Sequence, residues 1–512
     1  MDPSLTKPTR PHHGRHDTTD YEETAPLTSL SEVSRTVSRE SSTRIMSGTG
    51  TTVEHPRRVY WSFWLLGAVI LLSWNVLLCT LPLFTALLPR ESALRHSLPS
   101  YITTFFTLGN FGFLFAAQSG VGKISQNTRL HSSLWLLAAA TGLTAFPLLP
   151  AIFPILPSAP YFIALIALTL IFSYATSYLQ SSVLAIAALW GPQEMLAVMS
   201  GQGGIAVLIS AVQVYIAVMG VYASADAAIV KGPSDGSPST AELASGMGLW
   251  MAAIVPIVIC IIMTRRLFPR GAGSPTSAAA SQYPKLSFVP AGADEDGEFY
   301  DTERRFSAEE DEESRRGSTR GFHRSWAIMK RNRVINFSVA YVFIVTLAIF
   351  PSITTSIVSV RQPPPKLLDP AVFVPLHFLA FNVSDYLGRT YLPTIPMLFF
   401  HNSRHVMFAS LARTLFIPVF MLCNTSFADT SSLAHVPFIN SDIVYFIILF
   451  LFGASNGWIS SLSMIIASSP TMNPAIEEDE KDVAGSLAGF CLTGGLVVGS
   501  LASFVVGWIV KR

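Results

Sequence analysis

Charge and cysteine are both scarce in this chain. Only 13% of its 512 residues are charged, against roughly 25% in an ordinary soluble protein. The 34 Lys and Arg residues nearly cancel the 33 Asp and Glu residues, so net charge gives no basis for binding nucleic acid. The four cysteines lie far apart, which offers neither a zinc motif nor a disulfide framework. Half of the residues are hydrophobic and mean hydropathy is +0.44, which excludes a soluble enzyme and predicts a polytopic membrane protein.

Apolar runs long enough to cross a bilayer follow one another from Trp61 onward. A span needs ~20 mostly apolar residues to cover ~30 Å of hydrocarbon. The candidate spans are 61–88, 100–118, 132–154, 161–189, 195–221, 243–264, 334–360, 371–388, 405–423, 443–469 and 483–510. The sequence therefore predicts an all-α fold with eleven transmembrane helices in a 6+5 arrangement.

Two long polar segments set the predicted domain boundaries. Residues 1–58 are rich in Ser, Thr and Pro and have no apolar period, which predicts a disordered cytosolic tail. Residues 265–333 carry an acidic run and then basic residues, and we interpret them as a disordered cytosolic loop, with a phosphoregulated segment as the alternative. This division predicts a six-helix bundle over 59–264 and a five-helix bundle over 334–512. Two bundles joined by a long loop are typical of carriers that rock about a midplane site.

The distribution of Lys and Arg predicts the orientation. Fifteen of these residues lie near the span ends on one side and seven on the other. The positive-inside rule places the richer side in the cytosol. The N-terminus is therefore expected to be cytosolic and the C-terminus extracellular or lumenal.

Ionisable side chains inside the predicted spans are concentrated in two of them. Each such group costs ~2.5–3.5 kcal/mol or more at a helix centre. Span 371–388 contains His377 and Asp385 and is followed by Arg389, while span 405–423 begins at His405 and contains Arg413. This concentration makes the two spans the first place to look for function.

One face of span 371–388 combines several kinds of polar chemistry. Phe378, Asn382, Asp385 and Arg389 lie at offsets 0, 4, 7 and 11, which share a face at 3.6 residues per turn. We expect this face to line a central cavity. Asp385 and Arg389 are also an i,i+4 pair in the favourable acid-first order, so a structural ion pair is an equally good interpretation. Both roles can hold, because a carboxylate oriented by arginine still accepts a ligand hydrogen bond.

The other intramembrane polar groups have structural alternatives. We expect Arg413 to form a gate or a structural ion pair. His377 is expected to hydrogen-bond a neighbouring helix, with a proton-linked role left open. Trp74, Asn75 and Gln180 are compatible with stacking on and hydrogen-bonding a nucleobase, or with ordinary helix packing.

Several short motifs, taken in order along the chain, resemble those of the equilibrative nucleoside transporters. They are Trp74-Asn75, Gly191-Pro192, the Met-Ser-Gly-Gln-Gly of 199–203, the Asn-Val-Ser-Asp-Tyr-Leu-Gly-Arg of 382–389, Arg413, and Ser455-Asn456-Gly457. The resemblance, nearest to fungal-type members, spans most of 61–510. It implies a major-facilitator-like arrangement and nucleoside permeation by alternating access without ATP. Ser73 stands where the family has proline, and Ile205-Ala206 departs from its glycine-rich motif, which bears on transport rate or substrate range more than on fold.

The resemblance also implies roles for individual residues. Gln180 would contact the base beside Trp74, and Asp385 and Arg389 would engage the ribose hydroxyls. The implied substrate-binding set is Leu71, Trp74, Leu78, Gln180, Phe378, Asn382, Asp385 and Arg389. The implied gating or structural set is Asn75, Gln202, His377 and Arg413.

Two rival functions stay open at this stage. One is a permease for another small polar solute such as a sugar or amino acid, and the other is a non-transporting membrane receptor or scaffold. An enzyme is not expected, because the sequence has no paired intramembrane aspartates and no His-Glu-x-x-His motif. The expected partners are a purine or pyrimidine nucleoside and the lipid bilayer, with no nucleic acid, cofactor or metal. Proton coupling, oligomeric state and the choice between a vacuolar or lysosomal-type membrane and the plasma membrane are left open.

Overall fold

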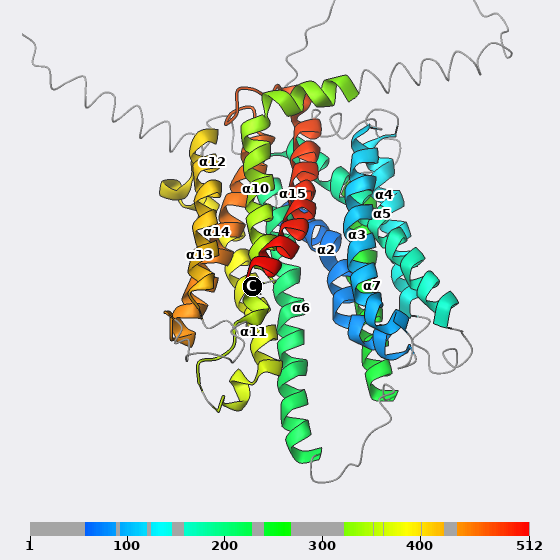
Figure 1. Ribbon diagram of the computed structural model, residues 1–512. Helices are drawn as coiled ribbons and strands as arrows, with labels where there is room; N and C mark the ends of the chain where they lie inside the picture. Colours follow the sequence, from blue (N-terminus) through cyan, green and yellow to red (C-terminus); the bar gives the residue numbers. More distant parts are fainter. Residues whose placement is uncertain are drawn as a thin grey trace, which may run out of the picture. The chain divides into compact units, whose positions relative to one another are not determined.

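The computed structural model describes residues 57–88, 93–119, 124–145, 158–227, 240–267, 322–351, 353–361, 363–400, 402–423 and 438–510. These residues form helices joined by short 3-10 turns, with an isolated bridge between Cys423 and Ile439. The first helices are α2 (Arg57–Ala86), α3 (Ala93–Ser119), α4 (Gln126–Ala145), α5 (Ser158–Trp190), α6 (Pro192–Ala227) and α7 (Thr240–Leu267). They are followed by α10 (Arg333–Ile349), α11 (Pro370–Thr390), α12 (Ser403–Ala412), α13 (Phe416–Met421), α14 (Asp442–Ala467) and α15 (Lys481–Val510). We refer to α2–α7 as the N-terminal helices and to α10–α15 as the C-terminal helices (Figure 1).

The structure confirms an all-α, multi-pass membrane protein. Among the described residues, α2, α5, α6, α7, α11, α14 and α15 are each long and apolar enough to cross a membrane. The helix Phe322–Arg331 and α10 together would supply an eighth span, bent by 82°. The helices α3, α4 and the pair α12–α13 lie where the other three spans are expected, and the count of eleven stays a prediction.

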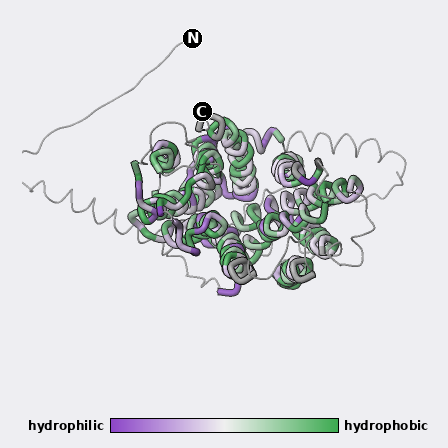
Figure 2. Tube along the Cα trace, turned by 60° about the horizontal axis from the view of Figure 1, so that its bottom comes forward, coloured by the Kyte–Doolittle hydropathy of each residue, from purple (hydrophilic) through white to green (hydrophobic). Residues whose placement is uncertain are grey.

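Large apolar side chains are exposed along these helices, as a lipid-facing surface requires. Ile163 is 66% exposed, Leu208 59% and Phe504 76%. Figure 2 shows hydrophobic residues distributed over all the helices in view. Such a surface would be an aggregation liability in water.

Two predicted boundaries were wrong, and each has a local cause. The predicted span 334–360 is too long, because α10 ends at Ile349 and Phe350 is extended (φ −109°, ψ 123°). Phe350 precedes Pro351, and a residue before proline is driven out of the helical region. The predicted loop 265–333 is too long at both ends, because α7 continues to Leu267 and the helix Phe322–Arg331 lies within it. The predicted tail over 1–58 lies outside the described residues, except that Arg57 and Arg58 already belong to α2.

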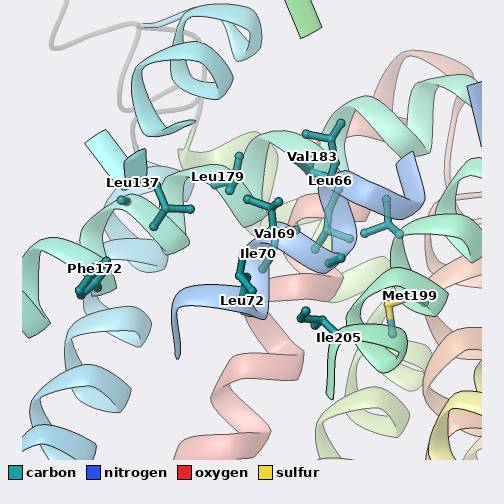
Figure 3. Packing of buried hydrophobic residues seen from close by; sticks show 14 of the residues in the cluster. Leu66, Val69, Ile70, Leu72, Leu137, Phe172, Leu179, Val183, Met199 and Ile205 are labelled. Atoms are coloured by element: carbon teal, nitrogen blue, oxygen red, sulfur yellow. The ribbon is translucent and has the colours of Figure 1, made fainter. Parts of the chain in front are cut away.

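The N-terminal helices pack around α2 and α5. Apolar side chains of α2, α4, α5 and α6 form one buried cluster (Figure 3), among them Leu66, Leu137, Phe172 and Ile205. The α2 and α6 backbones approach closely, because a Cβ on Gly67 would overlap the backbone of Val198. A Cβ on Gly201 would in turn overlap the backbone of Trp64. The glycines of the 201–204 motif therefore serve close helix packing, as small residues do in membranes.

The C-terminal helices pack in two close pairs, α11 with α14 and α10 with α15. A Cβ on Gly388 would overlap the carbonyl oxygen of Ala454, and one on Gly457 would overlap that of Asp385. A Cβ on Gly495 would likewise overlap the carbonyl oxygen of Ala340. Gly388 and Gly457 therefore bring the backbones of α11 and α14 together, and Gly495 does the same for α10 and α15.

The two sets of helices meet along α6 with α11 and along α15 with α3 and α5, as Figure 1 shows for α6 beside α11. Ser181 of α5 lies 2.8 Å from Ser486 of α15, oxygen to oxygen. Thr390 of α11 donates to Ser200 of α6 at 3.2 Å. These hydroxyl contacts occur near the end of α5, the start of α6, the end of α11 and the start of α15, so they lie at the same end of the helices.

Candidate functional site

A buried ion pair lies near the end of α11. The helix is started by Pro370 in its first turn and by the Asp369 side chain, which accepts from the Ala371 backbone at 2.9 Å. Four turns on, Arg389 Nε donates to Asp385 Oδ2 at 2.6 Å, and these side chains are only 8% and 6% exposed. The predicted i,i+4 ion pair is thus present. Buried charges of this kind are retained only with good geometry and additional hydrogen bonds.

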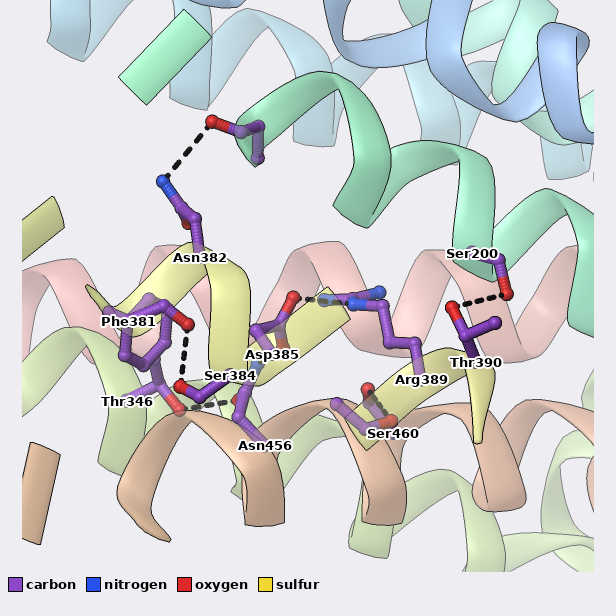
Figure 4. Close-up of polar contacts among 12 residues, drawn as sticks. Ser200, Thr346, Phe381, Asn382, Ser384, Asp385, Arg389, Thr390, Asn456 and Ser460 are labelled. Carbon is purple, nitrogen blue, oxygen red and sulfur yellow. Dashed lines mark hydrogen bonds and ion pairs between the residues drawn. The ribbon is translucent and has the colours of Figure 1, made fainter. Parts of the chain in front are cut away.

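Those additional bonds come from neighbouring helices (Figure 4). Asn456 Nδ2 of α14 donates to Asp385 Oδ1 at 2.6 Å. The Asn456 Oδ1 atom accepts from the Thr346 hydroxyl of α10 at 2.7 Å. Since Thr346 also accepts from Arg413 at 2.8 Å, a continuous chain of hydrogen bonds joins the two arginines. We call these five residues the polar network.

Arg413 occupies the far end of the polar network. It lies in the 3-10 turn η7 (Arg413–Leu415) between α12 and α13, and it is 2% exposed. It donates to the Phe452 carbonyl at 3.0 Å and to the Ser455 hydroxyl at 2.5 Å, with its guanidinium 4.6 Å from the centre of the Phe452 ring. Among the described residues Arg413 makes no direct ion pair. A carbonyl, two hydroxyls and an aromatic face surround its guanidinium instead, and its Nε is buried without a partner in the same part of the chain. Whether Arg413 gates the protein or only supports its structure stays a prediction.

One nitrogen of the ion pair lacks a hydrogen bond. Arg389 Nη1 is buried and has no partner among the described residues. A buried guanidinium N–H without an acceptor costs about 1–3 kcal/mol or more. The opposing surface is α6, where a Cβ on Gly203 would lie 3.2 Å from Arg389 Cδ. Arg389 thus holds a spare donor in addition to the Nε that binds the carboxylate.

The rest of the predicted face of α11 turns partly toward α6. Asn382, which is half-buried and points toward α6 in Figure 4, donates to Ser210 of α6 at 2.5 Å. It also donates to the Ala206 carbonyl at 3.4 Å. Phe378 is also half-buried, with its ring centroid 4.8 Å from that of Phe350. Asn382 therefore links the two sets of helices, the structural alternative that polar residues in membrane helices often take.

The predicted residues of α2 form a half-buried stripe. Leu71, Trp74, Asn75 and Leu78 follow the i, i+3, i+4, i+7 pattern of one helix face, and all four are of intermediate exposure. Asn75 donates to its own helix at the Leu71 carbonyl, 2.8 Å away. Trp74 stacks on Phe106 of α3 at a centroid distance of 4.1 Å, which orients the indole. Leu71, Trp74 and Leu78 are packed against the hydrophobic core without being fully buried.

Gln180 and Gln202 are more deeply buried than the α2 stripe. Gln180 of α5 is 5% exposed, and its Nε2 donates to the Thr493 hydroxyl of α15 at 3.3 Å. Gln202 is 7% exposed and lies between Gly201, which packs on α2, and Gly203, which packs on α11. Both glutamines thus lie where N-terminal and C-terminal helices meet.

His377 lies apart from the polar network. It is eight residues before Asp385, about 12 Å along the helix, and is fully buried. Its Nδ1 is 3.2 Å from the Tyr445 hydroxyl, and the rings of Phe373 and Phe446 lie close by. The expectation of an interhelical hydrogen bond is confirmed.

The structure unites some predicted residues and separates others. It joins Asp385, Arg389 and Arg413 in the polar network, whereas His377 packs elsewhere on α11. Two grooves on the described surface, one beside Asp442 and one beside Asn336, are not lined by a predicted substrate residue. In the part of the chain that the structure describes, no three His, Cys, Asp or Glu side chains cluster as metal ligands would.

Residue-by-residue reasoning missed Thr346 and the role of Asn456. The available signal for Asn456 was an amide followed by Gly457 in the middle of an otherwise apolar span. Thr346 carried no signal, because a lone threonine in an apolar helix usually bonds its own backbone. Its hydroxyl also lies 2.7 Å from the Val342 carbonyl, so its single proton is shared between that carbonyl and Asn456 Oδ1.

Comparison with known proteins places these observations in a family. A family model described as nucleoside transporter matches residues 165–508. Human equilibrative nucleoside transporter 1 is 27% identical over 498 residues, 90% of this chain and 100% of that protein. Equilibrative nucleoside transporter 2 of Rattus norvegicus is 36% identical over 166 residues, 32% of this chain and 34% of that protein. The nucleoside transporter FUN26 of Saccharomyces cerevisiae is 29% identical over 178 residues, 34% of this chain and 32% of that protein. The proton:xylose symporter XylE, a major facilitator superfamily protein, aligns over 88% of this chain and 86% of its own at 13% identity and a TM-score of 0.49.

Proposed function

Because this chain belongs to the nucleoside transporter family, we propose that it moves nucleosides across a membrane by alternating access and holds their ribose at Asp385 and Arg389. The observation that carries this proposal is the buried ion pair with a spare guanidinium donor. Arg413 Nε is also buried without a partner among the described residues, but Arg389 Nη1 belongs to a guanidinium bonded to a carboxylate, so a donor and an acceptor lie side by side.

The chemistry of the ion pair suits a vicinal diol. Each ribose hydroxyl both donates and accepts, so it is best held by an acceptor beside a donor. The Asp385 oxygens each accept one bond and retain further lone pairs, while Arg389 Nη1 supplies the donor. Bonds to charged groups contribute about 1.5–3 kcal/mol each, enough to select a hydroxylated solute.

The base would lie against the α2 stripe. Trp74 offers one ring face, since Phe106 covers the other, and aromatic rings stack well on heterocycles. Gln180 would exchange its bond to Thr493 for bonds to the base edge, where an amide can both donate and accept. Leu71, Leu78 and Phe378 would supply apolar walls.

The contacts between the two sets of helices suit a rocking movement. They include small-residue packing and single hydroxyl bonds, such as Ser181–Ser486 and Ser200–Thr390, which are modest individually. At the other end of α6, Lys366 lies 4.8 Å from the centre of the Tyr222 ring. In the orientation predicted from the Lys and Arg bias, with the N-terminus cytosolic, the end with the hydroxyl bonds is the cytosolic end. Opening toward the cytosol would require these hydroxyl contacts to part.

Flux into reconstituted vesicles tests the proposal. We expect purified protein in proteoliposomes to take up labelled adenosine or uridine, unlabelled nucleosides to compete, and sugars and amino acids not to compete. Asp385→Ala should abolish uptake while the protein still inserts. Asp369→Asn, which keeps the helix cap of α11, is the matched control and should transport normally. Competition by sugars or amino acids would instead favour a general permease, and full activity of Asp385→Ala would refute the site.

The same vesicles address proton coupling and residence. We propose facilitated transport, for which an imposed pH gradient leaves the final nucleoside distribution unchanged. Accumulation against the nucleoside gradient when a pH gradient is imposed would instead show proton coupling. The membrane of residence, vacuolar or plasma, is read from the location of the tagged full-length chain.

A further inference from the structure

An apolar groove of about 430 Å³ lies outside the nucleoside site, between α3, α10 and α15. Its walls include Phe111 of α3, Phe337 and Ile344 of α10, and Phe490 and Val498 of α15. Phe337 and Val498 are 46% and 49% exposed, so the groove opens to the surroundings of the helices. At this depth those surroundings are lipid.

One side chain in this groove is polar and unsatisfied. Asn336 is only 4% exposed, and neither its Nδ2 nor its Oδ1 has a hydrogen-bond partner. Leaving a buried amide unpaired is costly in protein and more so beside lipid. Such a group lining an apolar groove indicates a ligand that is mostly apolar and carries a polar atom at this level.

The start of α10 lies at the membrane interface. The helix Phe322–Arg331 meets α10 at 82°, so it runs across the bundle, as the horizontal green helix of Figure 1 shows. Its Phe322 and Trp326 are 43% and 49% exposed, and Lys330 lies 5.6 Å from the Trp326 ring centre. Exposed aromatic residues with basic neighbours are typical of the headgroup level.

The opposite face of this crosswise helix holds it in place. Ile328 is fully buried with Ile476 and Val483, and Arg324 pairs with Asp479 at 2.8 Å. Arg331 also pairs with Glu480. The headgroup level is therefore fixed relative to the groove.

We propose that this groove binds an anionic glycerophospholipid from the adjoining leaflet. Exposed Arg333 lies at the mouth of the groove and lines it. At 1.5 Å per residue, Asn336 is about 4.5 Å and Ile344 about 16 Å deeper along α10. The order Arg333, Asn336, Ile344 along α10 matches the order of the phosphate, the ester carbonyl and the acyl chain along a phospholipid. Arg333 binds the phosphate, Asn336 Nδ2 donates to the ester, and the aromatic walls cover the chain.

The groove crosses the seam between the two sets of helices. Phe111 of α3 stacks on Phe490 of α15 at a centroid distance of 5.0 Å. A lipid here therefore contacts N-terminal and C-terminal helices at once. Its occupancy favours the conformation in which those helices lie together.

Thermal stability of the full-length chain in detergent tests this site. Phosphatidylserine should raise the apparent melting temperature more than phosphatidylcholine does. Arg333→Gln should remove that preference, which we expect to be roughly fivefold in apparent affinity for one cation at an anionic headgroup. Arg404→Gln, an exposed arginine at the start of α12, is the matched control and should keep the preference.

Asn336→Leu distinguishes a loss of lipid binding from a loss of protein stability. Removing an unsatisfied buried amide should stabilise the lipid-free protein, while the response to added phospholipid falls. Gly494→Leu, which fills the groove against Phe111, should abolish the response. Unchanged lipid responses in Asn336→Leu and Gly494→Leu would overturn the proposal. So would a larger shift with a sterol than with phosphatidylserine, combined with no effect of Arg333→Gln.

Discussion

The structural and functional roles of the Asp385–Arg389 pair can be separated by removing one charge and then both. Asp385→Leu alone leaves Arg389 charged in a setting only 8% exposed. Breaking a buried pair in this way costs about 3–5 kcal/mol. Replacing both partners with apolar residues of similar size is often neutral, so Asp385→Leu/Arg389→Met should recover most of the lost stability.

Transport should not recover in the double variant. The ribose would lose at least two bonds to charged groups, together about 3 kcal/mol or more, which is roughly 100-fold or more in affinity. Melting temperature in detergent and adenosine uptake into proteoliposomes measure the two effects on the same preparations. If the double variant were stable and transported adenosine at near wild-type rates, the pair would be structural only.

Three further changes test the surroundings of the pair. Gly457→Ala should lower both the melting temperature and nucleoside uptake, because the added Cβ would overlap the Asp385 carbonyl. The control is Gly248→Ala, whose Cβ would enter open space, so this variant should be neutral or mildly stabilising. Equal behaviour of the two variants would refute the close packing. Thr346→Val should leave Asn456 Oδ1 and one Arg413 nitrogen unpaired, at a cost of about 1–3 kcal/mol each in folding free energy. The melting temperature should therefore fall, and a wild-type value would count against the polar network. Gln180→Leu should raise KM for nucleosides without reducing the amount of protein inserted, and an unchanged KM would remove Gln180 from the site.

Apolar patterning predicted helix positions well and helix ends poorly. Each of the eleven predicted spans overlaps a described helix or the α12–α13 pair, since hydrophobic length is a strong signal in membranes. The end of α10 at Ile349 and the helix Phe322–Arg331 were missed. The first depends on Pro351, and the second on contacts with residues more than 140 positions away, such as Ile476.

Helical spacing predicted the Asp385–Arg389 pair but not its surroundings. An i,i+4 pair is local, so periodicity alone is sufficient to find it. Thr346 and Asn456 are joined across 110 positions, and a single sequence contains no information on which helices pack together. Arg413 shows the same limit, because its partners are neutral groups of α10 and α14.

The central claim is that the Asp385 carboxylate binds the ribose hydroxyls, and a cycle that varies both substrate and protein tests it most directly. Adenosine and its 2′,3′-dideoxy analogue would compete for uptake into proteoliposomes bearing wild-type protein or Asp385→Asn. We expect the wild type to prefer adenosine at least tenfold and the variant to lose most of that preference. Equal discrimination by both proteins would contradict the claim.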